Sequence, residues 1–288
     1  MKIALGTAQF GMSYGVANEF RQVAMKEMRK ILDRAAQASV DTIDTAIGYG
    51  DSEARLGELG VHDWNVITKL PALPDSVVDV GTWLTQHVSA SLRRLRIRAL
   101  HALLLHRPAD LIGRHGGPLQ TALRRIKHEG QAKLIGVSIY DPGELDLLWQ
   151  TFRPDLVQAP LNVLDQRLVI SGWLGRLNIA GIRVHTRSSF LQGLLLMPAR
   201  KRPDYFKKWA SALDKWVDWC MGVGCSPLRA AVSFVLAQPG IEKVVVGVDS
   251  LTQLNEILQA AASPAPSPST DLACQDVGLL EPFRWRIL

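Results

Sequence analysis

Short apolar segments alternate with segments of helical periodicity along almost the whole chain. Eight of the apolar segments are continuous and rich in Val, Ile and Leu, which is typical of parallel strands buried on both faces. They span residues 3–7, 40–46, 65–70, 100–105, 133–138, 156–159, 182–186 and 243–248. Between them, apolar residues recur at helical spacing over 23–38, 81–95, 119–129, 143–151, 166–177, 227–237 and 251–262. This alternation predicts an α/β protein, a closed (β/α)8 TIM barrel.

Two stretches fall outside the repeat. Residues 194–224 follow the seventh predicted strand and carry basic and aromatic side chains, so we expect a lid-like loop and an extra helix there. Residues 263–270 form a Pro/Ser linker, and this linker and the C-terminal tail together span 263–288. The tail carries Phe283 and Trp285, which we expect to cover part of the barrel. Residues 1–288 are therefore predicted to form a single barrel domain with one excursion and a C-terminal tail.

Composition narrows the class of protein. Hydrophobic residues make up 47% of the chain and charged residues 21%, the balance of a folded protein. The three cysteines form no CxxC pair and no zinc-like cluster, so we expect no metal and a cytoplasmic location. The net charge is +6, but the Arg and Lys residues are scattered and lack the aromatic interleaving of RNA-binding sheets. A nucleic-acid partner is therefore not expected. No stretch approaches about 18 consecutive apolar residues, so no membrane span is expected. The sequence leaves the oligomeric state open.

Four ionisable residues of four types follow the carboxyl ends of neighbouring predicted strands. Asp44 lies at the end of the second strand and Tyr49 in the loop after it, Lys69 lies at the end of the third, and His106 at the end of the fourth. These ends converge on one mouth of a barrel. Tyrosine is a weak acid with a pKa of about 10, and a nearby ammonium stabilises its phenolate. A carboxylate keeps that ammonium charged, and a histidine can orient a carbonyl oxygen. The set predicts a proton-donating site for a carbonyl that accepts a hydride.

Short motifs in a fixed order resemble the aldo-keto reductase superfamily. They are Leu5-Gly6-Thr7-Ala8, Asp44-Thr45-Ala46 with Tyr49-Gly50, Thr68-Lys69, Ser91-Leu92-Arg93-Arg94-Leu95, Leu105-His106-Arg107-Pro108, Gly136-Val137-Ser138, Gln158 and Gln192-Gly193-Leu194-Leu195. The resemblance spans residues 5–258 and implies a bacterial member that binds NADPH or NADH and reduces an aldehyde or ketone. It implies that Tyr49 is the general acid, that Lys69 and Asp44 tune it, and that His106 orients the substrate carbonyl.

The resemblance also assigns cofactor contacts. Ser138 and Gln158 correspond to the residues that hold the nicotinamide carboxamide. The other contacts that it implies are Gly6, Thr7, Asp44, Arg187, Ser188, Phe190, Gln192, Gly247, Asp249 and Gln253. Arg187 stands where the family often has a tyrosine under the nicotinamide ring. A guanidinium can stack there too, and its positive charge would favour the neutral, reduced cofactor over the cationic, oxidised one.

The nucleotide end departs from the family pattern. The resemblance predicts a basic residue after the eighth strand for the 2′-phosphate of NADPH, but no Lys or Arg lies between Gly247 and Glu256. Asp249 falls close to the position where the family often has arginine. A carboxylate repels a phosphate and accepts a hydrogen bond from a free ribose hydroxyl, so we expect NADH to be accepted. Arg187 or the basic excursion is the alternative partner for a phosphate.

The loop after the first strand lies at the same mouth. We expect at least one of Phe10, Met12 and Tyr14 to contact substrate, with Phe10 and Tyr14 joining Tyr49 and His106. Segment 6–18 looks like a version found in bacterial reductases of sugar metabolism, so the substrate is predicted to be a small carbonyl compound such as a sugar derivative. Two alternatives stay open. One is a cofactor-binding barrel with a regulatory or scaffold role, and the other is a metal-dependent barrel hydrolase.

Overall fold

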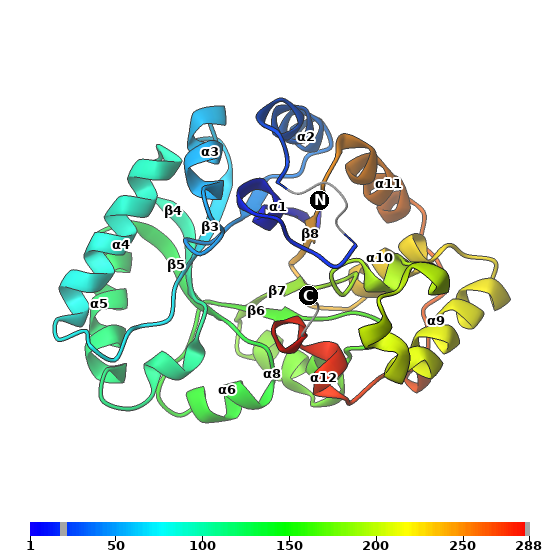
Figure 1. Ribbon diagram of the computed structural model, residues 1–288. Coiled ribbons are helices and arrows are strands. Elements are labelled where there is room, and N and C mark those ends of the chain that lie inside the picture. The colour runs from blue at the N-terminus through cyan, green and yellow to red at the C-terminus, as the bar shows by residue number, and fades with distance from the viewer. Residues whose placement is uncertain (18–21, 286–288) are drawn as a thin grey trace.

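The computed structural model describes residues 1–17 and 22–285 (Figure 1). Residues 18–21 and 286–288, which hold the last position of segment 6–18 and the end of the tail, lie outside the described residues. Eight parallel strands close into a barrel in the order of the sequence. They are β1 (Ile3–Gly6), β2 (Thr42–Asp44), β3 (Asn65–Leu70), β4 (Leu100–Leu105), β5 (Ala132–Ser138), β6 (Leu156–Pro160), β7 (Arg183–Arg187) and β8 (Lys243–Gly247). The (β/α)8 barrel predicted from the apolar pattern is confirmed.

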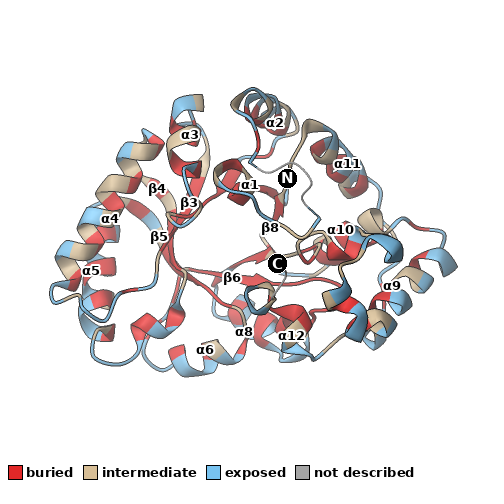
Figure 2. Ribbon diagram, in the orientation of Figure 1, coloured by how far each residue is buried: buried red, intermediate tan, exposed pale blue. Residues whose placement is uncertain are grey.

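Helices surround the barrel and turn their apolar faces to it, as the buried inner surfaces in Figure 2 show. In α2, for example, Met28, Ile31, Leu32 and Ala35 are buried at helical spacing. The helices are α1 (Ala8–Gly11), α2 (Met25–Gln37), α3 (Ser52–Leu59), α4 (Val80–Leu95), α5 (Gly116–His128), α6 (Gly143–Leu148), α7 (Arg167–Ile170), α8 (Trp173–Ile179), α9 (Ala210–Gly222), α10 (Pro227–Leu236), α11 (Leu251–Ala262) and α12 (Val277–Leu280).

One helix prediction needs correction, and three short helices were not predicted. The single helix predicted over 166–177 is two helices, because Gly172 adopts a left-handed conformation (φ 77°) between α7 and α8. The four-residue helices α1 and α12 were not predicted, and neither was the longer helix α3. Its buried positions include Ser52, Glu53 and Gly57, so the apolar periodicity that marks the other helices is weak there.

The lower interior of the barrel is filled by apolar side chains. Ile67, Ala102, Leu104 and Leu156 form a separate buried cluster on the inner faces of β3, β4 and β6. Side chains two residues further along each strand share this inner face, so Lys69, His106 and Gln158 stand above the cluster. Apolar packing therefore supports these three polar side chains from below, and they face the carboxyl ends of the strands.

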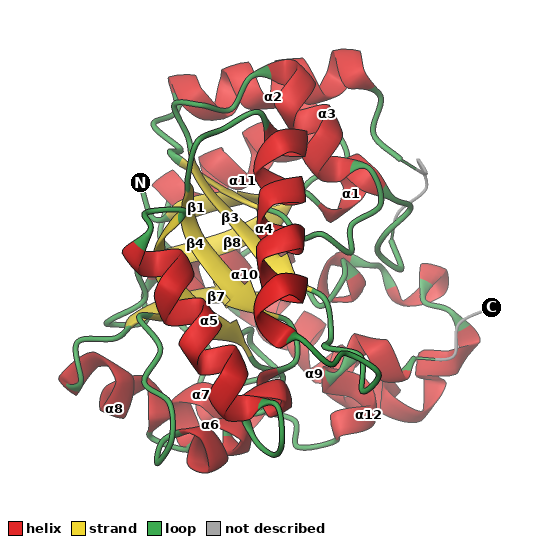
Figure 3. Cartoon of the chain, turned by 90° about the vertical axis from the view of Figure 1, so that its left-hand side faces the viewer, coloured by secondary structure: helices red, strands yellow, loops and turns green. Residues whose placement is uncertain are grey.

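The excursion and the tail pack together at this end. Three short 3-10 segments, Leu194–Leu196, Ala199–Lys201 and Asp204–Trp209, precede α9, which is the extra helix expected in the excursion. Figure 3 shows α9 and α12 at the same end of the barrel. The indole Nε1 of Trp209, which precedes α9, donates a 2.7 Å hydrogen bond to Oδ2 of Asp276, the residue that caps α12. The Trp285 ring packs edge-on against Phe206, with 4.8 Å between ring centroids.

Among the described residues, no single helix is long and apolar enough to cross a membrane. One helix pair, Asp204–Gly222 with Pro227–Leu236, reaches the length and composition only together, and it is bent by 94°.

Candidate active site

A buried ion pair lies at the carboxyl end of the barrel interior. The Lys69 ammonium donates to Asp44 Oδ1 at 2.6 Å and to the Thr45 carbonyl oxygen at 2.9 Å. Lys69 is fully buried, and burial lowers its pKa, while the adjacent Asp44 carboxylate opposes this shift. The pair compensates two charges that would each be costly to bury alone.

Tyr49 is held beside this pair by a tight loop. A Cβ on Gly11 would lie 1.7 Å from the Tyr49 carbonyl oxygen, and one on Gly50 would lie 2.2 Å from the Gly11 carbonyl oxygen. Gly50 also has a positive φ of 55°. Glycine at both positions lets the end of α1 approach the loop after β2, and this fixes where Tyr49 enters the barrel mouth.

The rings of Tyr49 and His106 meet edge to face. Their centroids are 6.0 Å apart with an interplanar angle of 63°. The Lys69 Nζ lies 5.3 Å from the Tyr49 ring centroid. Tyrosine, histidine, lysine and aspartate are thus brought together, as expected from their positions at the strand ends.

Burial keeps Tyr49 and His106 neutral. It raises the pKa of the Tyr49 hydroxyl above its ordinary value of 10, and the Asp44 carboxylate adds to this effect while Arg187 opposes it. Burial also lowers the pKa of His106 to about 3, and the charges of Lys69 and Arg187 act in the same direction. The expected lowering of the tyrosine pKa is not found, because the Lys69 ammonium donates to Asp44 and Thr45 rather than to the phenol.

A cavity of about 790 Å³ opens above these residues. The predicted residues that line its reaction end are Tyr14, Asp44, Tyr49, His106 and Arg187. Those that line its remaining walls are Gly6, Thr7, Ser188, Phe190, Gln192, Gly247, Asp249 and Gln253. One continuous cavity therefore joins the Tyr49–His106 pair to the amino-terminal end of α11.

Four predicted residues do not line this cavity. Lys69, Ser138 and Gln158 are buried beneath it. Phe10 is fully buried in the core, so the prediction that it contacts substrate is wrong. The reason is that residues 8–11 form a short helix whose buried side chains are Ala8 and Phe10, whereas Tyr14, further along the same loop, reaches the cavity.

Tyr140, Lys201 and Glu256 also line the cavity, although the sequence did not predict them as site residues. The signal for Tyr140 was its position two residues after β5, since loops at strand carboxyl ends face the mouth. Lys201 belongs to the basic excursion, which the sequence offers as an alternative partner for a phosphate, and Glu256 ends the segment without Lys or Arg.

The loop after β7 is strained where it lines the cavity. Ser188, Leu191 and Gln192 all have positive φ values, of 62°, 48° and 55°. The Asn162 amide donates to the Ser188 carbonyl oxygen at 3.0 Å, which supports this conformation. Backbone strain of this kind persists only where surrounding contacts hold it, and it is concentrated at functional sites.

The Arg187 guanidinium is held in place by three neighbouring residues. Its guanidinium carbon lies 4.3 Å from the Tyr140 ring centroid, and its Nη atoms donate to Ser188 Oγ at 3.2 Å and to the Ile139 carbonyl oxygen at 3.0 Å. Within the described residues it forms no ion pair with a carboxylate. Its positive charge is therefore left uncompensated at the cavity wall.

Asp249 offers an acceptor at the other end of the cavity. Its Oδ1 is buried without a hydrogen-bond partner in the described chain, and burial raises its pKa. Its backbone N–H donates to Gln253 Oε1 at 2.8 Å, while Ser250 caps α11 by accepting from the Gln253 N–H at 3.2 Å. A buried, unsatisfied carboxylate oxygen fits a hydroxyl donor such as that of a nucleotide ribose.

Side chains that could bind a metal ion are not clustered among the described residues. In residues 1–17 and 22–285, no group of three or more His, Cys, Asp or Glu side chains is arranged to hold a metal ion. The donor set at the barrel mouth therefore does not favour the metal-dependent hydrolase alternative.

Comparisons with known proteins agree with this fold. The profile of the aldo/keto reductase family matches residues 2–270. The chain is 25% identical to 6-dehydroglucose reductase of Novosphingobium aromaticivorans over 278 residues, which cover 90% of this chain and 87% of that protein. It is 24% identical to the uncharacterized oxidoreductase YqkF of Bacillus subtilis over 260 residues, 80% of this chain and 81% of that protein.

A solved structure shares the fold. The aldo-keto reductase AKR11C1 from Bacillus halodurans, in its holo form, superposes with a TM-score of 0.72 at 18% identity, covering 94% of this chain and 89% of that one. A structural likeness at 18% sequence identity is evidence for the barrel fold alone. The family profile covers almost the whole chain, so the chain belongs to the aldo/keto reductase family and is an oxidoreductase.

Proposed function

We propose that this protein is an NAD(P)H-dependent reductase that converts an aldehyde or ketone to an alcohol. The observation that carries the proposal is the buried Lys69–Asp44 pair beside the neutral rings of Tyr49 and His106, at the wall of one large cavity. A reduced nicotinamide cofactor, when bound, supplies the hydride for the carbonyl carbon.

The proton for the carbonyl oxygen comes from Tyr49. The raised pKa keeps the phenol protonated at neutral pH but makes it a weaker acid, so donation depends on nearby positive charge. The charge of Arg187 favours the phenolate that donation leaves behind, while the Lys69 ammonium, 5.3 Å from the ring centroid, holds Asp44 in place. Neutral His106 presents an N–H that orients the carbonyl oxygen.

The cofactor preferred is NADH. The unpaired Asp249 oxygen would accept a hydrogen bond from a ribose hydroxyl, and its charge and that of Glu256 on the same cavity would repel a 2′-phosphate. Lys201 lines the same cavity and opposes this preference. Gly6, Thr7, Ser188, Phe190, Gln192, Gly247 and Gln253 are proposed to contact the cofactor from the cavity walls, with Ser138 and Gln158 beneath.

The substrate is a polar carbonyl compound such as a sugar derivative. Of the four tyrosines in the chain, Tyr14, Tyr49 and Tyr140 all line the cavity. Phenol hydroxyls and aromatic faces together suit a polyhydroxyl ligand. The relative in Novosphingobium is named for the reduction of a dehydroglucose, which supports the same class of substrate.

Titration with NADH and NADPH, followed by quenching of tryptophan fluorescence, tests the proposal. Binding of one or both cofactors, with turnover of an aldehyde or sugar carbonyl, is the expected result. Tight binding without turnover of any carbonyl would favour a regulatory barrel instead. Absence of binding would overturn the proposal.

A further inference from the structure

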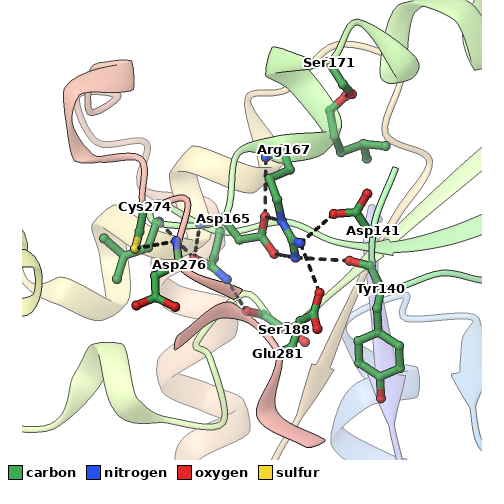
Figure 4. Close-up of polar contacts among 12 residues, drawn as sticks. Tyr140, Asp141, Asp165, Arg167, Ser171, Ser188, Cys274, Asp276 and Glu281 are labelled. Carbon is green, nitrogen blue, oxygen red and sulfur yellow. Dashed lines mark hydrogen bonds and ion pairs between the residues drawn. The ribbon is translucent and has the colours of Figure 1, made fainter. Parts of the chain in front are cut away.

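Arg167, which lies outside the cavity, uses all five of its N–H donors on described residues (Figure 4). Its Nε and one Nη donate to the two oxygens of Asp165, each at 2.9 Å. The same Nη donates to the Tyr140 carbonyl oxygen at 3.1 Å. The other Nη donates to Asp141 Oδ2 at 2.8 Å and to Glu281 Oε1 at 3.2 Å. One guanidinium thus binds five acceptor atoms of four residues on three separate segments.

These segments are far apart in sequence. Asp165 follows β6, Tyr140 and Asp141 follow β5, and Glu281 follows α12 in the C-terminal tail. Arg167 and Asp165 are almost fully buried, as is Glu281. Removing one partner of such a network leaves a buried charge without compensation, so the network holds the tail firmly against the two barrel loops.

The tail meets the same loop at a second point. The Phe283 ring packs against the Tyr140 ring at 67°, with 4.6 Å between centroids. The Arg187 guanidinium lies 4.3 Å from the centroid of that same ring. Tyr140 and Arg187 line the cavity, whereas Phe283 is 59% exposed and belongs to the tail. Tyr140 is therefore the link between the tail and a charge at the cavity wall.

We propose that Arg167, Glu281 and Phe283 are positioning residues that hold Tyr140 and, through it, fix the Arg187 guanidinium at the mouth of the cavity. Arg187 is close enough to Tyr49 and His106 for its charge to affect both. The inference rests on the proposed function and on the expectation from the sequence that the Arg187 charge disfavours the cationic, oxidised nicotinamide. The C-terminal tail would then influence the balance between oxidised and reduced cofactor without touching either.

Calorimetric titration of the full-length protein with oxidised and reduced cofactor tests this coupling. The quantity compared is the Kd for the oxidised form divided by the Kd for the reduced form. Arg187→Met should lower this ratio at least about fivefold, because a repulsive charge is removed. Phe283→Ala and Glu281→Ala should lower it about twofold or more. Adding Phe283→Ala to Arg187→Met should change it no further, since both act through one guanidinium.

Two variants provide controls in the same tail. Phe283→Tyr keeps the ring against Tyr140, and Trp285→Phe alters a side chain that packs on Phe206 instead. Both should leave the ratio at the wild-type value. If Arg187→Met lowers the ratio but both tail alanine variants do not, or if their effects add fully to that of Arg187→Met, the coupling is wrong while the proposed function stands. An unchanged ratio in Arg187→Met also contradicts the coupling. If the wild-type protein binds neither form, the proposed function itself fails.

Discussion

The Gln158 side-chain amide donates a 2.7 Å hydrogen bond to Asp44 Oδ2, although 114 positions separate the two residues in the sequence. Lys69 donates to the other oxygen of the same carboxylate at 2.6 Å. Asp44 is therefore held from both sides in the barrel interior. Gln158 therefore supports the ion pair through its Nε2, while its Oε1 lies 3.5 Å from Ser138 Oγ.

Gln158→Leu should lower both the free energy of unfolding and kcat. The substitution leaves one Asp44 oxygen buried without a partner, which costs about 1–3 kcal/mol of unfolding free energy. The freed carboxylate can also turn away from Lys69, so kcat should fall. Urea denaturation and steady-state kinetics measure the two effects. Gln259→Leu, on the exposed face of α11, should change neither, and an unaltered Gln158→Leu protein would contradict this role.

Tyr49→Phe should lower kcat by the ~10²–10⁴ that is typical of a lost general acid. The ring and its packing against His106 are retained, so the cofactor Kd should stay close to the wild-type value. Stopped-flow kinetics with fluorescence titration separates the two quantities. Tyr205→Phe, the one tyrosine substitution placed away from the cavity, serves as the matched control. Turnover that survives in Tyr49→Phe would assign the proton to another donor.

His106 should make the protein less stable in acid. Its pKa is about 3 in the folded state against an ordinary 6.5, so the unfolded chain binds the extra proton between these values. The free energy of unfolding should rise with pH from about 3 to about 6.5 and level off above, with a contribution of at most about 5 kcal/mol.

Urea denaturation at several pH values, compared between the wild type and His106→Asn, isolates this contribution. The variant should show a shallower pH dependence in that window. His62→Asn changes a largely exposed histidine and should follow the wild-type curve. Identical slopes for the wild type and His106→Asn would show that His106 is not kept neutral by the fold.

Asp249→Asn should shift the cofactor preference toward NADPH. Removing the carboxylate removes its repulsion of a 2′-phosphate and weakens acceptance of the ribose hydroxyl. The ratio of the NADPH Kd to the NADH Kd should fall about tenfold, roughly 1.4 kcal/mol. Asp218→Asn, on the exposed face of α9, should leave the ratio unchanged. Tighter binding of NADPH than of NADH by the wild type would assign the phosphate to Lys201 or Arg187.

The strands were predictable because their sequences are unambiguous. Runs such as Val66-Ile67 and Leu103-Leu104-Leu105 are apolar on both faces, and every predicted strand lies within two residues of an observed one. Once eight strands are placed, their carboxyl ends identify Asp44, Lys69 and His106 as neighbours. That part of the site follows from topology alone.

Loop conformation and contacts across the barrel could not be predicted in this way. Phe10 and Tyr14 lie on one loop, and only the short helix α1 decides that the first faces the core and the second the cavity. The Gln158–Asp44 hydrogen bond joins β6 to β2, which are not neighbouring strands. The stack of Arg187 on Tyr140 depends on the loop after β5, whose path the sequence does not specify.

The most direct test of the account is oxidation of NADH and NADPH by the purified protein in the presence of a panel of carbonyl compounds. The panel should include simple aldehydes, aldoses and oxidised sugars, with identification of the product. We predict carbonyl-dependent oxidation of the cofactor with formation of the matching alcohol, fastest for a polyhydroxyl substrate. Cofactor that stays reduced with every carbonyl, at protein concentrations where binding is saturated, would contradict the assignment of this barrel as a carbonyl reductase.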